Sequence, residues 1–238
     1  MHSIARLASL LLPAVTMLLS GPSSARELCG ATPVDVTVAM TTPHERRLVC
    51  AGARQALDLL ASCGIAPRST IDINIKSEVR HPLAGPIFGY FDLDERQITL
   101  TSLDGLPELM QDTPYAGLPP DTFYKSLAVH EVVHSVMHQN LEGRPASHAA
   151  YEYPAYALQI ASLPAADRST FLKAFDRARI ERASHLSDTI LTFAPYFFAA
   201  RAYTHFATSP SGCAYVRAVM MDGHDKLVDA RVASDDAD

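Results

Sequence analysis

Apolar and polar residues alternate along several short stretches in the first half of the chain, a period of two that is typical of half-buried strands. Residues 34–40, VDVTVAM, show it most clearly, because every second side chain is apolar. The same pattern predicts strands at residues 71–79, 87–91 and 97–101, with a hairpin turn at 92–96. Residues 45–62 instead carry apolar side chains at helical spacing, which predicts an amphipathic helix.

The second half of the chain follows the period of helices. It opens with nineteen residues, 102–120, that contain four prolines and predict an irregular loop, which we expect to shape a cleft. Helices are predicted beyond Asp121, the expected N-cap, at residues 122–138, 147–162, 167–183 and 188–207, with a short run after Cys213. Strands followed by helices predict an α+β fold.

The composition fits one globular domain, because 48% of the 238 residues are hydrophobic and 19% are charged. This apolar fraction is too high for a disordered chain and sufficient for a sizeable core. The formal net charge is −6, and no basic run is longer than Arg46 and Arg47. A nucleic-acid partner is therefore not expected.

The first 25 residues have the features of a secretory signal peptide. Arg6 lies in a short polar start, an apolar stretch follows at 7–20, and small residues precede the expected cleavage after Ala25. The apolar stretch is shorter than the roughly 20 residues of a spanning helix. We therefore expect a secreted or periplasmic protein whose single domain comprises residues 26–238, without a membrane span after cleavage.

All four cysteines (Cys29, Cys50, Cys63 and Cys213) follow this leader. An even number in an exported chain predicts two disulfides. Cys50 and Cys63 flank most of a predicted helix and would be about 20 Å apart, which is too far for a bond. Each is therefore expected to pair with Cys29 or Cys213, and both arrangements remain open.

An HExxH motif, formed by His130, Glu131 and His134, lies inside the predicted helix at 122–138. Residues four apart share a helix face, so the two imidazoles can bind one tetrahedral metal, for which zinc is the expected ion. Glu131 is rotated by about 100°, beside the metal, where it can accept a proton from a metal-bound water whose pKa falls towards about 7. Burying Glu131 among apolar neighbours for no such purpose would be costly.

With this motif, the chain resembles the zincin superfamily of metallopeptidases across residues 87–163. Position 140 is Asn, which excludes the metzincin branch, because that branch has His there. The gluzincin branch implies a Glu ligand from the next helix. Glu152 fits, since a helical hairpin turning at 141–146 would return it to the level of the motif. Glu142, in the turn, is the competing carboxylate.

The resemblance implies a zincin-like fold, in which a small N-terminal antiparallel or mixed sheet precedes a helical half that carries the motif. It also implies that the strand at 97–101 lies along the cleft and pairs through a free edge with an extended substrate. The chain departs from the branch at two positions. Pro154 would start or kink the ligand helix. Tyr156 stands where the branch has an Asp four residues past the ligand, so the support expected of a metal ligand must come from elsewhere.

Other polar residues have weaker claims. His138 continues the spacing of the motif but lies too far along the helix to share the metal, and His148 is a substitute ligand only if Glu152 fails. Candidates for stabilising an oxyanion have no diagnostic spacing; they are Tyr151, Tyr153, Tyr156, Tyr203 and His205.

These observations predict a secreted zinc-dependent hydrolase, a metallopeptidase of gluzincin type acting on a peptide or protein. In this interpretation His130, His134 and Glu152 bind Zn²⁺ and Glu131 is catalytic. One alternative is an exported binding or inhibitory protein whose zinc is structural and closed by four protein ligands. Another is a zinc hydrolase that acts on a non-peptide bond.

Overall fold

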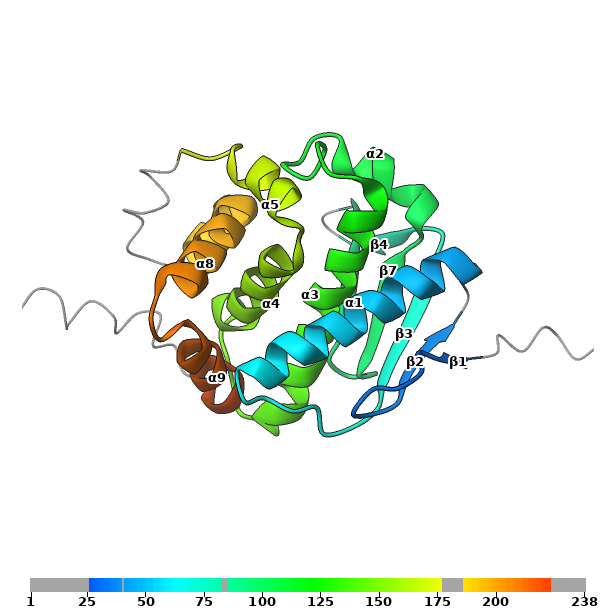
Figure 1. Ribbon diagram of the computed structural model, residues 1–238, viewed down its shortest axis with the longest axis horizontal. Coiled ribbons are helices and arrows are strands. Elements are labelled where there is room, and N and C mark those ends of the chain that lie inside the picture. The colour runs from blue at the N-terminus through cyan, green and yellow to red at the C-terminus, as the bar shows by residue number, and fades with distance from the viewer. Residues whose placement is uncertain (1–25, 40, 83–84, 177–185, 224–238) are drawn as a thin grey trace, which may run out of the picture.

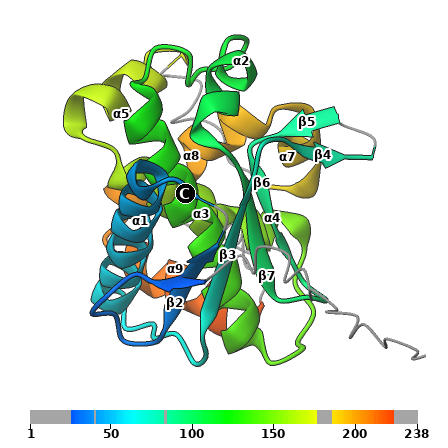
Figure 2. The same cartoon turned by 90° about the vertical axis from the view of Figure 1, so that its right-hand side faces the viewer.

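A mixed five-stranded sheet forms one side of the molecule, and the helices pack against it and against one another (Figures 1 and 2). The computed structural model describes residues 26–39, 41–82, 85–176 and 186–223. The strands, in their order across the sheet, are β1 (Glu27–Leu28), β2 (Val36–Ala39), β3 (Ile71–Lys76), β7 (Gln97–Thr101) and β6 (Gly89–Asp92). The predicted α+β class is confirmed.

The central strands β2, β3 and β7 are parallel, and the outer strands β1 and β6 run antiparallel to their neighbours. The predicted hairpin between β6 and β7 is present. Its turn is held by the Asp92 carboxylate, which accepts hydrogen bonds from the backbone N–H groups of Asp94 and Glu95. A second hairpin, β4 (Val79–His81) with β5 (Gly85–Ile87), lies between β3 and β6 in the chain.

The expectation that the strand at 97–101 has a free edge is wrong. β7 pairs with β3 on one side and with β6 on the other, so both of its edges are occupied. The strand at this edge of the sheet is β6, because the tight hairpin places it on the side of β7 that is not paired with β3; β1 forms the opposite edge.

Helix α1 (Pro43–Ser62) connects β2 to β3. It begins two residues before the predicted start because Thr42 and Glu45 form a capping box, in which each side chain accepts a hydrogen bond from the other's backbone N–H. Its Gly52 allows close packing on the motif helix: a Cβ at this position would lie 2.3 Å from the carbonyl oxygen of Lys125.

The segment at 102–120 is not the irregular loop that was expected throughout. It contains a 3₁₀ turn, η1 (Leu103–Gly105), and a short helix, α2 (Leu106–Met110). Its buried apolar side chains anchor it to the core; they are Leu106, Met110, Tyr115 and Leu118. Leu106 and Met110 are four residues apart, but this helical spacing does not continue to Tyr115 and Leu118, so the pattern alone did not reveal the structure of the segment.

The helical half consists of α3 (Pro120–Leu141), α4 (His148–Ser162), α5 (Ala165–Leu172), α7 (Asp188–Phe193), α8 (Pro195–Thr208) and α9 (Gly212–Asp222). α3 begins at Pro120 rather than after Asp121, because proline suits the first helical position. The helix predicted at 188–207 is interrupted at Ala194, whose φ of −150° and ψ of 63° reflect the steric restriction imposed by Pro195. α5 ends well before residue 183, and residues 177–185 lie outside the described residues.

Two disulfides join segments that are distant in the sequence. Cys29 pairs with Cys50 and Cys63 with Cys213, which confirms the expectation that Cys50 and Cys63 do not pair with each other. The second bond ties the end of α1 to α9. The predicted leader and the tail at 234–238 lie outside the described residues. Within the described part of the chain, no helix combines the length and the apolar character that a membrane span requires.

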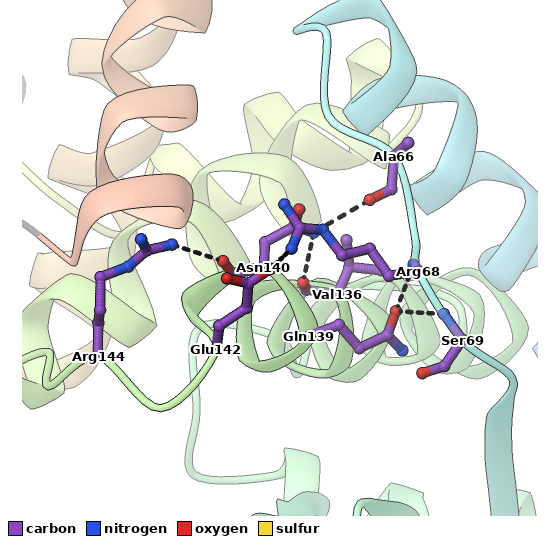
Figure 3. A network of polar contacts seen from close by, with 8 residues as sticks. All are labelled: Ala66, Arg68, Ser69, Val136, Gln139, Asn140, Glu142 and Arg144. Carbon is purple, nitrogen blue, oxygen red and sulfur yellow. Dashed lines mark hydrogen bonds and ion pairs between the residues drawn. The ribbon is translucent and has the colours of Figure 1, made fainter.

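The C-terminal end of α3 is held by hydrogen bonds that Figure 3 shows, and we call them the Gln139–Asn140 network. The side-chain oxygen of Gln139 accepts hydrogen bonds from the backbone N–H groups of Arg68, at 2.7 Å, and Ser69, at 3.1 Å. The Asn140 amide donates to the Ala66 carbonyl at 3.0 Å. The network thus fixes the connection between α1 and β3 against α3.

Candidate metal centre

Helix α3 carries the HExxH motif through the middle of the helical half, with α1 on one side and α4 on the other (Figure 1). Because apolar residues occur on nearly all of its faces, α3 is buried along most of its length. The motif side chains share this burial: His130 is 7%, Glu131 4% and His134 8% exposed.

Helix α4 returns alongside α3 after a short connection. α3 ends at Leu141 and is followed by Glu142 and Gly143, both with positive φ (52° and 81°). Ser147 then caps α4 by accepting a hydrogen bond from the backbone N–H of Ala150. α4 therefore begins at His148 and runs through Pro154 to Ser162, which confirms the helix predicted at 147–162. Of the two effects expected of Pro154, a helix start at this residue is not observed. The start at His148 places Glu152 on α4, beside the motif.

Three side chains converge between α3 and α4. The Nε2 atoms of His130 and His134 are 3.0 Å apart. Glu152 places Oε2 3.3 Å from Nε2 of His130, and Oε1 3.4 Å from Nε2 of His134. Among the described residues, they form the one group of three or more His, Cys, Asp or Glu side chains whose ligand atoms all lie within 4.8 Å of one another.

The spacing of these atoms suits a tetrahedral ion. Two ligands that each lie about 2.0–2.1 Å from such an ion are about 3.3 Å apart. The two Nε2 atoms, 3.0 Å apart, come close to this separation, and each of them also lies 3.3–3.4 Å from one oxygen of Glu152, although the oxygen differs between the two histidines. Two imidazoles and a carboxylate are also a ligand set that zinc accepts. His130, His134 and Glu152 therefore fit a metal ion.

The charges within this group depend on one another. Burial alone would raise the pKa of Glu152, but the adjacent His134 and His130 outweigh it and hold that pKa well below its usual range. Burial likewise opposes the charged form of His134, and the carboxylate of Glu152 reverses this and raises the pKa of His134. The carboxylate thus remains ionised, as a metal ligand must be.

Glu131 lies beside this group without belonging to it. Burial raises the pKa of its carboxyl, and the two histidines oppose that rise only in part. Its Oε2 is buried and has no hydrogen-bond partner among the described residues. The edge strand β6 passes close by, since a Cβ built on Gly89 would lie 3.5 Å from Oε1 of Glu131. Glu131 therefore places a carboxylate oxygen without a hydrogen-bond partner among the described residues between the ligand group and the edge of the sheet.

All four residues line a cleft of about 530 Å³. Its other walls come from the segment between β5 and β7, the segment at 102–120, and helices α4 and α8. Many lining side chains are aromatic: Phe88, Tyr90, Phe91, Tyr115, Phe123, Tyr151, Tyr156 and Tyr196. The cleft is thus mainly apolar, with its ionisable groups gathered at the metal centre.

A family model described as a family of unknown function (DUF6639) matches residues 36–226. The chain belongs to this family. Comparison with curated proteins and with solved structures finds no match. The matched residues include α3 and α4, so the ligand group of this DUF6639 protein lies within the region that matches the family.

The other candidate ligands of this DUF6639 protein lie outside the group. Glu142 ends α3 and forms an ion pair with Arg68. The ring of His138 lies 5.5 Å from that of Phe91, which agrees with a role away from the metal. His148 lines the cleft but is not part of the group.

Of the five oxyanion candidates, only Tyr151 and Tyr156 line the cleft. The hydroxyl of Tyr153 lies 2.6 Å from Nδ1 of His205, so these two are engaged with each other. The ring of Tyr203 lies 5.4 Å from the guanidinium carbon of Arg168.

Several residues of the cleft were not predicted from the sequence as site residues, and three of them are polar side chains near the ligand group or in the walls of the cleft. Gln159 contacts His130, with 3.0 Å between its Oε1 and the histidine Nδ1. It follows Glu152 by seven residues, about two helical turns, so helical spacing could have revealed it. Tyr115 and Tyr196 also line the cleft. Tyr115 lies in the segment at 102–120, where no periodic pattern predicted its position.

Proposed function

We propose that this protein is a zinc-dependent hydrolase that cleaves peptide bonds. The observation that carries the proposal is the combination of two features: a three-ligand group that fits a metal, and beside it a buried acid with one carboxylate oxygen that has no hydrogen-bond partner among the described residues. Leaving a buried carboxylate unpaired is costly, and such groups are concentrated at sites where they react.

In this proposal His130, His134 and Glu152 hold the ion. Bound zinc would lower the pKa of a water and polarise the carbonyl of the substrate. Glu131 accepts a proton from the attacking water and returns it to the leaving amine. Its burial supports this role, because burial raises the pKa of the Glu131 carboxyl and so makes it a better proton acceptor.

The size of the ligand group favours catalysis over a structural zinc. Structural sites are closed by four protein ligands, whereas catalytic sites combine three with an open position. His138 and His148, which could have closed the site, lie outside the group. An exported binding or inhibitory protein with a structural zinc is therefore the less favoured alternative.

The cleft supports a peptide substrate. The edge strand β6 borders it, and an extended peptide can add to such an edge through main-chain hydrogen bonds. The aromatic walls would accept apolar side chains. Two disulfides agree with a secreted or periplasmic protein, the location that we propose.

The test compares the wild-type protein with Glu131→Gln. We expect about one zinc per chain in both proteins, since Glu131 is not a ligand. Against a library of internally quenched peptides, the variant should lose about 100-fold or more of the hydrolysis, because the proton acceptor is gone. A variant as active as the wild type would refute the role of Glu131. A zinc-loaded wild type that cleaves esters but no peptide would instead favour a non-peptide substrate.

A further inference from the structure

A chain of buried polar contacts runs from His130 back into its own helix. Nδ1 of His130 lies 3.0 Å from Oε1 of Gln159. The Gln159 amide nitrogen lies 3.5 Å from Oγ of Ser126. The Ser126 hydroxyl donates to the carbonyl of Phe123 at 2.8 Å. Gln159 and Ser126 are 2% and 1% exposed, so water cannot easily replace these contacts.

The direction of each hydrogen bond follows from the last one. A serine hydroxyl has a single hydrogen, and that of Ser126 is used on the Phe123 carbonyl. Ser126 can therefore only accept from Gln159, which turns the NH₂ group of Gln159 towards Ser126 and its oxygen towards His130. The Nδ1 atom of His130 must then carry the proton.

We infer that Gln159 is a positioning residue that holds His130 in the Nδ1–H tautomer, and that Ser126 fixes the orientation of the Gln159 amide. In this tautomer the lone pair of Nε2 points to the side of the ring where Glu152 and His134 lie. The consequence for metal binding rests on the proposed function, whereas the tautomer does not.

A neutral amide suits this place. The carboxylates of Glu131 and Glu152 already line the cleft, and a third carboxylate at the buried position of Gln159 would add a further cost of burial. Gln159 supplies the required acceptor without a charge. Gln159 thus supplies the hydrogen bond to a metal ligand that was expected from an acid at position 156, where this chain has Tyr156.

The first measurement is the tautomer of His130 in the metal-free protein, read from ¹⁵N chemical shifts of labelled histidine at a pH where the imidazoles are neutral. The wild type should show a protonated Nδ1 and an unprotonated Nε2. Gln159→Leu, which keeps the size but removes the acceptor, should show a mixture of tautomers. Gln159→Glu retains an acceptor and should restore the wild-type tautomer.

The second measurement is zinc affinity in competition with a chelator. Gln159→Leu should bind zinc about 10–100-fold more weakly than the wild type. Gln159→Glu should restore most of this loss of affinity. Ser126→Ala should weaken zinc binding by a factor at the lower end of the same range. Gln55→Leu is the matched control, because the Gln55 amide also bonds α4, at the carbonyl of Ser162, but does not contact His130. Its zinc affinity should equal that of the wild type.

The two measurements separate the possible failures. If Gln159→Leu keeps the Nδ1–H tautomer, the inference is overturned, whatever its zinc affinity. If the wild type binds no zinc, the proposed function fails, and a tautomer lost in Gln159→Leu still supports the positioning role. A loss of zinc affinity of the same size in Gln55→Leu would show that the effect is general and would overturn the link to metal binding.

Discussion

Two buried glutamates in this protein have opposite surroundings. Glu45, at the start of α1, is 7% exposed, and Glu131, in the middle of α3, is 4% exposed. Glu45 accepts hydrogen bonds from the backbone N–H groups of Thr42, at 3.0 Å, and Leu103, at 2.8 Å. Glu131 leaves Oε2 without a partner among the described residues.

This difference decides which form of each acid is stable. Burial opposes the charge of Glu45, but the backbone hydrogen bonds from Thr42 and Leu103 outweigh it and lower the pKa. Burial raises the pKa of Glu131, and the two neighbouring histidines offset this rise only in part. A buried acid whose partners are complete stabilises the fold, whereas one left open is available for chemistry.

The Gln139–Asn140 network extends the comparison along α3. Its amides bond the connection between α1 and β3 directly (Figure 3), whereas two turns earlier the motif directs its histidines at each other and at a carboxylate. One helix thus carries a closed polar cluster, the Gln139–Asn140 network, whose amides are hydrogen-bonded to the backbone, and an open one, the motif, whose side chains are available to bind a metal.

The largest expected effect is on zinc affinity, and its absence would refute the distinction between the two clusters. His134→Ala removes a ligand and should weaken zinc binding by more than about 100-fold, since even residues that only orient a ligand are worth 10–100-fold. Gln139→Ala, on the same helix but in the closed network, should bind zinc as the wild type does. Titration with a competing chelator measures both, and equal affinities for His134→Ala and the wild type would show that the open cluster is not a metal site.

A smaller effect concerns the free energy of unfolding and is tested by making the same substitution, Glu to Gln, at each of the two acids. In metal-free protein, Glu45→Gln should lower the free energy of unfolding by about 1 kcal/mol, because it weakens a helix cap. Glu131→Gln should leave this free energy unchanged or raise it, because it removes a buried acid that lacks a partner. Urea unfolding curves give both values. Equal losses in the two variants would mean that Glu131 also stabilises the fold.

The smallest effect is the pH dependence that Glu45 contributes. Its folded pKa lies below its ordinary value of 4.5, so its contribution is complete above that value and is lost as the pH falls through the folded pKa. The stability difference between wild type and Glu45→Gln should therefore be constant near neutral pH and shrink below about pH 4.5. Unfolding curves at several acidic pH values measure it. A difference that persists unchanged at the lowest pH would assign the effect to the shape of the side chain.

Local patterns predicted much of this molecule. The motif spacing and the predicted helical hairpin place His130, His134 and Glu152 together, because one helical turn and one reversal of the chain determine their positions. The length of a helix likewise excluded a bond between Cys50 and Cys63, although only the fold could choose between the two remaining partners.

The errors concern relations that local patterns do not contain. Whether a strand lies at the edge of a sheet depends on which distant strand pairs with it, and β3 takes the side of β7 that had been expected to be free. Residues 102–120 have no periodicity, so burial of Tyr115 could not be foreseen. Pro195 did carry a local signal, since proline restricts the residue before it, and the break at Ala194 could have been predicted.

The most direct test of the central claim is anomalous diffraction at the zinc edge from crystals of the zinc-loaded protein. Our account predicts one peak about 2.0–2.2 Å from Nε2 of His130, Nε2 of His134 and a carboxylate oxygen of Glu152, with a non-protein oxygen at the remaining position. No peak at these residues, or a fourth protein side chain that completes the coordination, would contradict it.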